Sequence, residues 1–358
     1  MAAVSAIALT SCVNEDNFGD VKHKQQAQEL RFDLPAMMKT RANVKGEITG
    51  SEYDKGEDFK VFCKYYKGAY TSWDAAEGDY FTAPGDVAVN QGGNSNYWQT
   101  DNVYYWPDHE YNLAFAAFSP AVLETAPEKI EQTATGLYIK GFKTETNADA
   151  QYDLMYSDRV VDRNIANNGS TAVPLVFRHA LSSIVFSTEK EDENVNYEIT
   201  SIKLHGSVIQ QADFNQNIDE SVDVKAGSAK WENFAAATDA TYIPTLNGAV
   251  TVTTVPTQFT QKESALLLIP QDVHNDLFVT VTYNKITNPN DPAKKLVMQN
   301  TAKINLNQFA QENGNKITTW EMGKRYVYRI SFGLNKRIYF EPSTTDWVQE
   351  PTLIYTIQ

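Results

Sequence analysis

The side chains best suited to acid–base or metal chemistry are the consecutive triplet Asp108, His109 and Glu110 and the five histidines. Three adjacent polar residues point in different directions on a strand or turn, so we expect the triplet to form a surface turn and not a joint metal site. The histidines are scattered without metal-ligand spacing, at His23, His109, His179, His205 and His274. The sequence also lacks the short motifs of zinc proteases, serine hydrolases, phosphate-binding loops and calcium-binding loops. We therefore predict no enzyme, no metal site and no cofactor.

Cysteine chemistry is the second candidate, and the two cysteines have different surroundings. Cys63 lies in the alternating stretch FKVFCKYY and is expected to pack as a small apolar residue of a strand. Cys12 instead ends an apolar segment of the size of a signal-peptide core, with small residues before the break. The motif LTSC at this position resembles the lipobox of bacterial lipoproteins, in which the signal is cut off and the cysteine is acylated. The resemblance implies acyl chains on Cys12, and two or more chains anchor a protein firmly.

The first 41 residues are accordingly expected to be processed and tethering sequence. Residues 1–11 would be a signal peptide, truncated at its start because no Lys or Arg precedes Cys12. Residues 12–41 would be a lipidated tether that includes a short, removable strand. The alternative is that Cys12 follows this apolar segment by chance and is not a lipidation site. No apolar run approaches the 18 residues that a transmembrane helix needs.

The elements that would position any functional site are expected to be strands. Short segments rich in Val, Ile, Thr and aromatic residues alternate with clusters of Gly, Asn, Asp and Pro, which predicts an all-β fold. A chain of 358 residues fits two domains, and the polar stretch NIANNGSTA suggests a division into 42–172 and 173–358. The net charge of −14 argues against nucleic acid as a partner, because nucleic-acid binding needs clustered Lys and Arg.

Alternation of apolar and polar residues marks the individual strands. We expect strands in DFKVFCKYY, DNVYYW, YNLAFAAF, GLYIKGF, YDLMYSD, ALLLIPQ, DLFVTVTYNKI and RYVYRISF. In DLFVTVTYNKI, the side chains expected to face inward are Leu277, Val279, Val281 and Tyr283. In the stretch VPLVFRHALSSIVF, one strand face is expected to carry Leu175, Phe177, His179, Leu181, Ser183 and Val185. The lone His179 would then be a hydrogen-bonded core residue and not a ligand.

Both ends of the chain carry a short strand pattern with three large apolar residues on one face. Near the start these residues are Leu30, Phe32 and Leu34, and Pro35 ends the pattern. Lys39 and Arg41 follow in a segment without structural period, where proteases tend to cut. At the other end the residues are Leu353, Tyr355 and Ile357. An exposed strand of this kind promotes aggregation unless it is covered or used.

Several of these segments together resemble the fimbrillin (Mfa-like) family, the subunits of type V pili on Bacteroides-type bacteria. They are LTSC, LRFDL followed by KTRA, PLVFRHALSSIVF, and GKRYVYRISFGL with IYFEPSTTDW, which span residues 9–347. The resemblance implies two tandem transthyretin-like β-sandwich domains. It also implies export as an outer-membrane lipoprotein to the cell surface, where an Arg-directed protease removes the first strand. A terminal strand of the next subunit then takes its place, and the subunits form a fimbria that supports adhesion.

Applied to this chain, the resemblance assigns lipidation to Cys12 and proteolytic cleavage to the bond between Arg41 and Ala42. Arg31 is a weaker cleavage site, because a cut there would leave Phe32 and Leu34 in place. The plug strand would carry Leu30, Phe32 and Leu34, and the donor strand, within residues 338–358, would carry Leu353, Tyr355 and Ile357. The implied partners are other fimbrial subunits, the outer membrane through the Cys12 lipid, and host or bacterial surface glycans or proteins.

Alternatives remain open at this level. The chain could belong to the shaft of the fimbria, or it could be a tip or accessory subunit. It could also be a glycan-binding surface lipoprotein or tip adhesin in which Trp73, Trp98 or Trp106 forms a stacking platform, although aromatic residues of β-sandwiches more often belong to the core. A hydrolase would require carboxylates clustered in a cleft.

Overall fold

The structure is a computed structural model of the chain. Side chains and backbone are described for residues within 28–33, 58–81, 85–90, 97–125, 129–168, 171–216, 229–260, 265–308 and 316–333. Five further segments are described by their backbone strands alone, at 310–311, 338–341, 343–346, 348–349 and 353–357. Cys12, Leu34, Arg41 and Ala42 lie outside the described residues.

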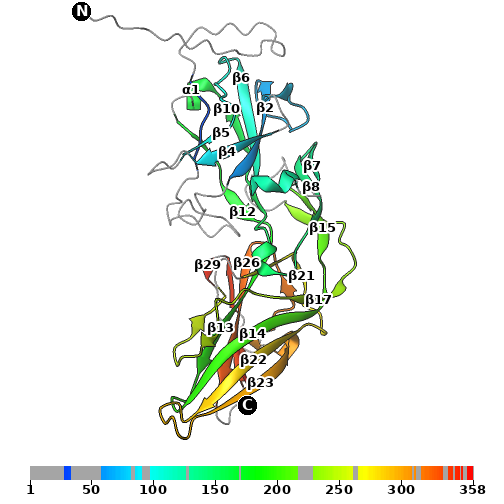
Figure 1. Cartoon of the computed structure of the whole chain (residues 1–358). Helices are drawn as coiled ribbons and strands as arrows, with labels where there is room; N and C mark the ends of the chain where they lie inside the picture. The colour runs from blue at the N-terminus through cyan, green and yellow to red at the C-terminus, as the bar shows by residue number, and fades with distance from the viewer. Residues whose placement is uncertain are drawn as a thin grey trace, which may run out of the picture.

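Strands dominate the described residues, and the expectation of an all-β fold is confirmed. The helical elements of these residues are short: η1 (Ala121–Thr125), η2 (Ala148–Ala150), α1 (Ile165–Asn168) and η4 (Leu306–Gln308). Figure 1 shows an elongated molecule, with one group of strands in its upper half and another in its lower half. The division into two transthyretin-like domains at residue 172 stays a prediction.

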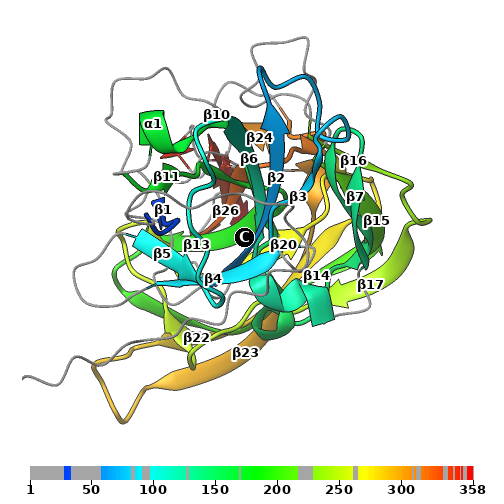
Figure 2. The same cartoon turned by 90° about the horizontal axis from the view of Figure 1, so that it is seen from above.

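Ten of the described strands form the first sheet, in the order β11-β1-β5-β4-β2-β6-β9-β12, with β3 beside β2 and β10 beside β6. Their bounds are β1 (Phe32–Asp33), β2 (Phe59–Lys67), β3 (Gly78–Asp79), β4 (Asp86–Asn90), β5 (Tyr97–Thr100), β6 (Tyr111–Ser119), β9 (Met155–Ser157), β10 (Val160–Arg163), β11 (Val173–Pro174) and β12 (Phe177–His179). β11 and β12 end the two sides of this order, yet only two residues connect them. A link that short requires the sheet to curl back on itself, and Figure 2 shows its strands following a curve.

The curled sheet has apolar side chains on both faces. The inner core includes Phe59, Val61 and Cys63 of β2 and Leu113, Phe115 and Ala117 of β6. The alternate residues of the same strands, such as Phe62, Ala116 and Phe118, pack into a second core against a four-stranded sheet of order β16-β15-β8-β7. That sheet consists of β7 (Lys129–Thr133), β8 (Gly136–Lys143), β15 (Gln211–Asn215) and β16 (Lys230–Glu232). Burial on both faces explains why β2 and β6 are apolar at most positions.

The remaining strands form a sandwich at the other end of the molecule. One sheet has the order β19-β13-β26-β28-β29, with β20, β24, β27 and β30 attached, and the other has the order β17-β14-β22-β23, with β18 beside β14. The first contains β13 (Ser182–Lys190), β19 (Thr257–Gln258), β20 (Leu266–Leu268), β24 (Ala310–Gln311), β26 (Lys324–Phe332), β27 (Ile338–Glu341), β28 (Ser343–Asp346), β29 (Val348–Gln349) and β30 (Leu353–Ile357). The second contains β14 (Val195–Val208), β17 (Thr238–Tyr242), β18 (Val250–Thr251), β22 (Phe278–Thr287) and β23 (Leu296–Asn305), and β21 (Gln271–Asp272) pairs separately with β25 (Thr319–Trp320).

The core of this sandwich confirms the inward face expected for DLFVTVTYNKI. Leu277, Val279 and Val281 are fully buried and Tyr283 is nearly so. They share a core with side chains of the facing sheet, among them Ile184, Tyr328 and Ile330. The alternate residues of β22 therefore lie on the outer face of their sheet.

The expected single face from Leu175 to Val185 is wrong. β12 ends at His179 in the first sheet, and β13 starts at Ser182 in the sandwich. Between them, Ala180 donates its N–H to the carbonyl of Leu154, and Leu181 packs into the core behind the first sheet. Strict alternation fails here because the chain leaves one sheet and enters another, which changes the partner that each side chain faces.

Candidate functional site: the groove around residues 28–33

Residues 28–33 lie in a groove of the first sheet, with a neighbouring strand on either side. β1 runs antiparallel to β5, with Phe32 opposite Trp98, and parallel to β11, with Phe32 opposite Val173. Backbone hydrogen bonds extend this pairing on both sides. On one side, the Leu30 N–H donates to the Tyr104 carbonyl at 2.8 Å and the Trp106 N–H donates to the Gln28 carbonyl at 2.9 Å. On the other side, the Val173 N–H donates to the Arg31 carbonyl at 2.7 Å and the Leu175 N–H donates to the Asp33 carbonyl at 2.8 Å. The segment is thus hydrogen-bonded along both of its edges.

The side chains of this segment alternate between the core and the surface. Leu30 is 1% exposed and Phe32 is 0% exposed, whereas Arg31 is exposed. Phe32 meets Phe59 and Phe115 edge to face, at ring-centroid distances of 6.2 and 5.5 Å. The core around them also includes Trp98, Val173, Leu175 and Phe177. Burial of Leu30 and Phe32 stabilises the contact by roughly 1.5 to 3 kcal/mol each.

The charged residues of the segment contribute less. The Arg31 guanidinium lies 4.9 Å from the centroid of the Tyr97 ring, and its Nη2 lies 3.1 Å from Oε2 of Glu29. The Gln99 side-chain amide donates to the other oxygen of Glu29. Exposed ion pairs of this kind contribute about 0 to 1 kcal/mol. The apolar residues and the backbone hydrogen bonds therefore hold residues 28–33 in the groove.

Sequence patterns identified the buried face of this segment but not the walls of the groove. The expected strand DNVYYW is wrong, because within it only Tyr105 makes a bridge, to Glu29. The regular strand is instead β5, which supplies Trp98. On the other wall, β11 comes from a distant part of the chain. The apolar residues Val173 and Leu175 were the available signal, but nothing local indicates that they pair with residues 28–33.

The C-terminal segment lies in the sandwich and not in the groove. The backbone of β30, which contains Leu353, Tyr355 and Ile357, runs parallel to β26, from Leu353 opposite Tyr328 to Ile357 opposite Phe332. β30 is also antiparallel to β27 and β24. β1 and β30 thus share one feature, which is that each pairs with both a parallel and an antiparallel strand.

The three tryptophans considered as a glycan platform are buried. Trp73 and Trp98 are 1% exposed and Trp106 is 3% exposed. Trp73 packs behind the first sheet and donates its Nε1–H to Gln132 Oε1 at 3.0 Å. Trp98 and Trp106 belong to the core that holds Phe32. The prediction that these rings form a stacking platform is therefore wrong, because no ring face reaches solvent.

The acid–base triplet and the histidines that the structure describes do not form a common site. Asp108 and Glu110 flank His109 at the turn before β6, and the His109 N–H donates to Asp108 Oδ1 at 2.6 Å. His179 has a hydrogen bond of 3.0 Å between its Nδ1 and Asp153 Oδ1, as expected for a satisfied histidine. His23 lies outside the described residues. Within the described part of the chain, no three His, Cys, Asp or Glu side chains gather as metal ligands.

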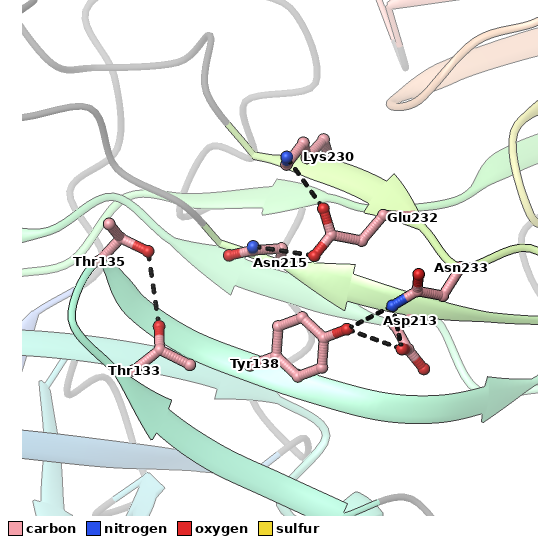
Figure 3. Close-up of polar contacts among 8 residues, drawn as sticks. All are labelled: Thr133, Thr135, Tyr138, Asp213, Asn215, Lys230, Glu232 and Asn233. Atoms are coloured by element: carbon pink, nitrogen blue, oxygen red, sulfur yellow. Dashed lines mark hydrogen bonds and ion pairs between the residues drawn. The ribbon is translucent and has the colours of Figure 1, made fainter.

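A polar cluster joins β8, β15 and the end of β16 (Figure 3). Tyr138 donates its hydroxyl proton to Asp213 Oδ2 at 2.7 Å, and the Asn233 amide donates to the same carboxylate oxygen at 2.8 Å. The Gly141 N–H donates to Asp213 Oδ1 at 2.7 Å. Beside them, the Asn215 amide donates to Glu232, which also pairs with Lys230 at 2.9 Å.

The pKa values in this cluster suit a structural link more than acid–base catalysis. Burial alone would raise the pKa of Asp213, but the hydrogen bonds from Tyr138, Asn233 and Gly141 lower it below its usual value. Burial and the hydrogen bond to Asp213 raise the pKa of Tyr138 to about 12. A general acid or base works best with a pKa near the operating pH. At neutral pH Tyr138 instead remains the hydrogen-bond donor and Asp213 the acceptor, and their hydrogen bond links β8 to β15.

Comparisons with known proteins point to a single family. A sequence model of a family described as fimbrillin-like matches residues 40–347. The crystal structure of a fimbrial protein from Bacteroides vulgatus is similar with a TM-score of 0.52 and 17% identity, over 82% of this chain and 92% of that chain. This similarity supports a shared fold. No curated protein matches the sequence.

Two further crystal structures cover most of the chain at lower similarity. They are candidate cell adhesion proteins from Bacteroides uniformis and Bacteroides ovatus, with TM-scores of 0.48 and 0.46 and identities of 13% and 14%. The first covers 87% of this chain and 100% of its own, and the second 94% and 99%. Among the residues that the structure describes, none of the helices has the length and apolar character to span a bilayer.

Proposed function

Because the chain belongs to the fimbrillin-like family, we propose that it is a structural subunit of a cell-surface fimbria that polymerises by strand exchange. In this proposal the precursor is exported as an outer-membrane lipoprotein acylated at Cys12. A protease cuts between Arg41 and Ala42, and residues 28–33 then leave the groove. The observation that carries the proposal is the full burial of Phe32 in a two-walled groove, within a segment that precedes the proposed cleavage site.

Removal of residues 28–33 would leave the protein in a state that favours a replacement strand. The cut would uncover the core around Phe59 and Phe115 and would unpair the facing edges of β5 and β11. Unpaired edges and exposed apolar surface both favour the addition of another strand. Before cleavage, Leu30 and Phe32 would keep the monomer from polymerising early.

The C-terminal strand is the proposed donor to the next subunit. Its sequence alternates Leu353, Tyr355 and Ile357 with Ile354 and Thr356, as the plug alternates Leu30 and Phe32 with Arg31. β30 already pairs with one parallel strand, β26, and with antiparallel strands, and the groove also offers one parallel and one antiparallel partner. A head-to-tail contact of this kind extends into a filament.

A tip subunit is the second candidate, and the pairing of β30 favours it. To donate β30, the protein must first release it from β24, β26 and β27. A subunit that keeps β30 in its own sheet could accept a strand but could not donate one. It would then end the fimbria, with its remaining surface available for adhesion to a glycan or protein.

An Arg-specific protease tests the cleavage step. Purified residues 12–358 are digested, the new N-terminus is sequenced, and filaments are sought by electron microscopy. We expect filaments from the unchanged chain and from Arg31→Lys, which serves as the matched control, but none from Arg41→Lys. Filaments from uncut protein would contradict the role of residues 28–33 as a plug.

Truncation and an added peptide separate shaft from tip. A variant without residues 352–358 should be cleaved normally and form no filaments if β30 donates. Filaments that persist would contradict the donor role. If the cleaved full chain stays monomeric but binds an added peptide of residues 348–358, the tip assignment is supported. If the protein has been shown to be cleaved and yet neither polymerises nor binds the peptide, strand exchange is contradicted.

The lipid anchor has its own test. When a strain that expresses the gene is grown with labelled fatty acid, the label should appear on the unchanged precursor and be absent from Cys12→Ala. Label on the Cys12→Ala chain would contradict this modification site.

A further inference from the structure

The outer face of the β17-β14-β22-β23 sheet presents two lysines in one cross-strand row. Lys203 of β14 lies opposite Thr280 of β22, and Thr280 lies opposite Lys303 of β23. Their neighbours along the strands, Leu204, Val279 and Ile304, are buried in the sandwich core. Because side chains alternate across a sheet, the lysine row faces outward, on the strands that run side by side in the lower half of Figure 1.

Aromatic and polar side chains lie next to this row. Lys303 Nζ lies 3.7 Å from the centroid of the Phe278 ring, and Phe278 stacks on His205 at 4.8 Å with an interplanar angle of 14°. His205 Nδ1 lies 2.9 Å from Thr241 Oγ1, and its Nε2 lies 2.8 Å from Thr280 Oγ1. Phe278 thus contacts both Lys303 and His205, and His205 contacts Thr280.

The row carries positive charge that the described residues do not neutralise. In the part of the chain that the structure describes, neither Lys203 nor Lys303 forms an ion pair. Burial lowers the pKa of His205, and the nearby charges of Lys203 and Lys303 lower it further, whereas Asp239 opposes them. Both ammonium groups therefore act on the same small region, in a protein whose net charge is −14.

Hydroxyl groups continue the polar face next to the lysines. In the following row, Thr282 Oγ1 of β22 lies 3.3 Å from Thr301 Oγ1 of β23. Adjacent strands are about 4.8 Å apart, so the Cα atoms of Lys203 and Lys303 are separated by about 10 Å. Lysine side chains are long enough to bring both ammonium groups over Thr280 from that separation.

We propose that Lys203 and Lys303, with the hydroxyl of Thr280 between them, bind the carboxylate or sulfate group of an acidic glycan. The two ammonium groups supply charge-assisted hydrogen bonds to the anion. The hydroxyls of Thr282 and Thr301 supply donors and acceptors for the sugar ring that carries it. The proposal goes beyond fimbrial assembly and does not depend on strand exchange, because the lysine row and the groove around residues 28–33 lie in different sheets.

Binding of the uncleaved monomer to immobilised polysaccharides tests the proposal. Hyaluronan provides carboxylates, heparin provides sulfates as well, and dextran serves as the neutral control. We expect binding to at least one acidic polysaccharide and not to dextran. The double variant Lys203→Gln/Lys303→Gln should bind roughly tenfold more weakly or worse. Its melting temperature should fall by no more than about 4 °C, because both side chains lie on the outer face and the variant loses only the contact of Lys303 with the Phe278 ring.

A charge-matched variant separates a local site from a general charge effect. Lys294→Gln/Lys295→Gln removes the same net charge from the loop between β22 and β23 of the same sheet, and it should bind as the unchanged chain does. Equal loss in both double variants would overturn the proposal, since it would indicate a net-charge effect only. Failure of the unchanged chain to bind either acidic polysaccharide, or equal binding to dextran, would also overturn it.

Discussion

Phe32 and Phe115 pack edge to face, with ring centroids 5.5 Å apart and an interplanar angle of 79°, although they belong to distant parts of the sequence. Phe115 is a fully buried residue of β6, and its neighbours Ala114 and Ala116 pack into the core on the opposite face. The contact therefore joins the N-terminal segment to a strand that is shared by two cores. Residues 28–33 are part of the folded core in the uncleaved chain.

Truncation of this ring should destabilise the precursor. We expect Phe32→Ala to lower the free energy of unfolding by about 3 to 5 kcal/mol, because it removes a fully buried ring and leaves a cavity beside Phe59 and Phe115. Arg31→Ala, one residue away on the exposed side, should change it by about 0.5 kcal/mol or less. Urea denaturation of both variants measures the difference, and equal stability would show that the groove does not depend on Phe32.

A buried ion pair near the crossing between sheets should also matter for stability. Arg178 of β12 makes two hydrogen bonds of 2.7 Å to the carboxylate of Asp158, and its side chain is 2% exposed. Arg178→Met removes the guanidinium from beside this largely buried carboxylate, whose side chain is 13% exposed, and should cost about 3 to 5 kcal/mol. The double variant Arg178→Met/Asp158→Leu should recover much of the loss. Thermal unfolding checks this, and a double variant less stable than the single one would contradict it.

Asp213 should give stability that depends on pH. Its pKa in the folded protein is lowered from 3.8, so its contribution is present above the unfolded pKa and is lost as the pH falls through the folded pKa. Asp213→Asn places an amide among the donors Tyr138, Asn233 and Gly141. We expect it to be less stable by about 1 to 3 kcal/mol at pH 7, with a difference that shrinks below about pH 4.

The matched control for this measurement is Asp239→Asn, which changes an exposed carboxylate. Denaturation between pH 7 and pH 2 should show little difference for that variant at any pH. A constant deficit of Asp213→Asn across the range would indicate a packing defect instead of a lost charge.

The Cys63 thiol should be unreactive in the folded protein. Its side chain belongs to the core around Phe32, and burial raises its pKa well above the usual value. In a Cys12→Ser background, we expect a thiol reagent to label Cys63 on the order of 100-fold more slowly in buffer than in 6 M guanidinium chloride. Absorbance of the released chromophore follows the rate. Fast labelling of the folded protein would contradict the placement of this thiol.

Local alternation predicted many of the strands and their buried faces. FKVFCKYY and DLFVTVTYNKI form β2 and β22, with Cys63 and Val279 in cores as expected. DNVYYW forms no regular strand because only its last three residues meet a partner, through the isolated bridge from Tyr105 to Glu29, whereas Val103 is 55% exposed and lies outside any ladder. The continuous face from Leu175 to Val185 failed because the chain changes sheets inside it.

For the candidate site, the sequence by itself determined which side of the N-terminal segment is buried, since the alternation of Leu30 and Phe32 with Arg31 follows from the geometry of a single strand. Only the tertiary structure decided that β5 and β11 form the walls of the groove, that β30 lies beside β26, and that Lys203 and Lys303 flank Thr280. The physical reason is that the face of a side chain depends on its own backbone. The partner and register of a strand depend on apolar contacts with residues far away in the chain.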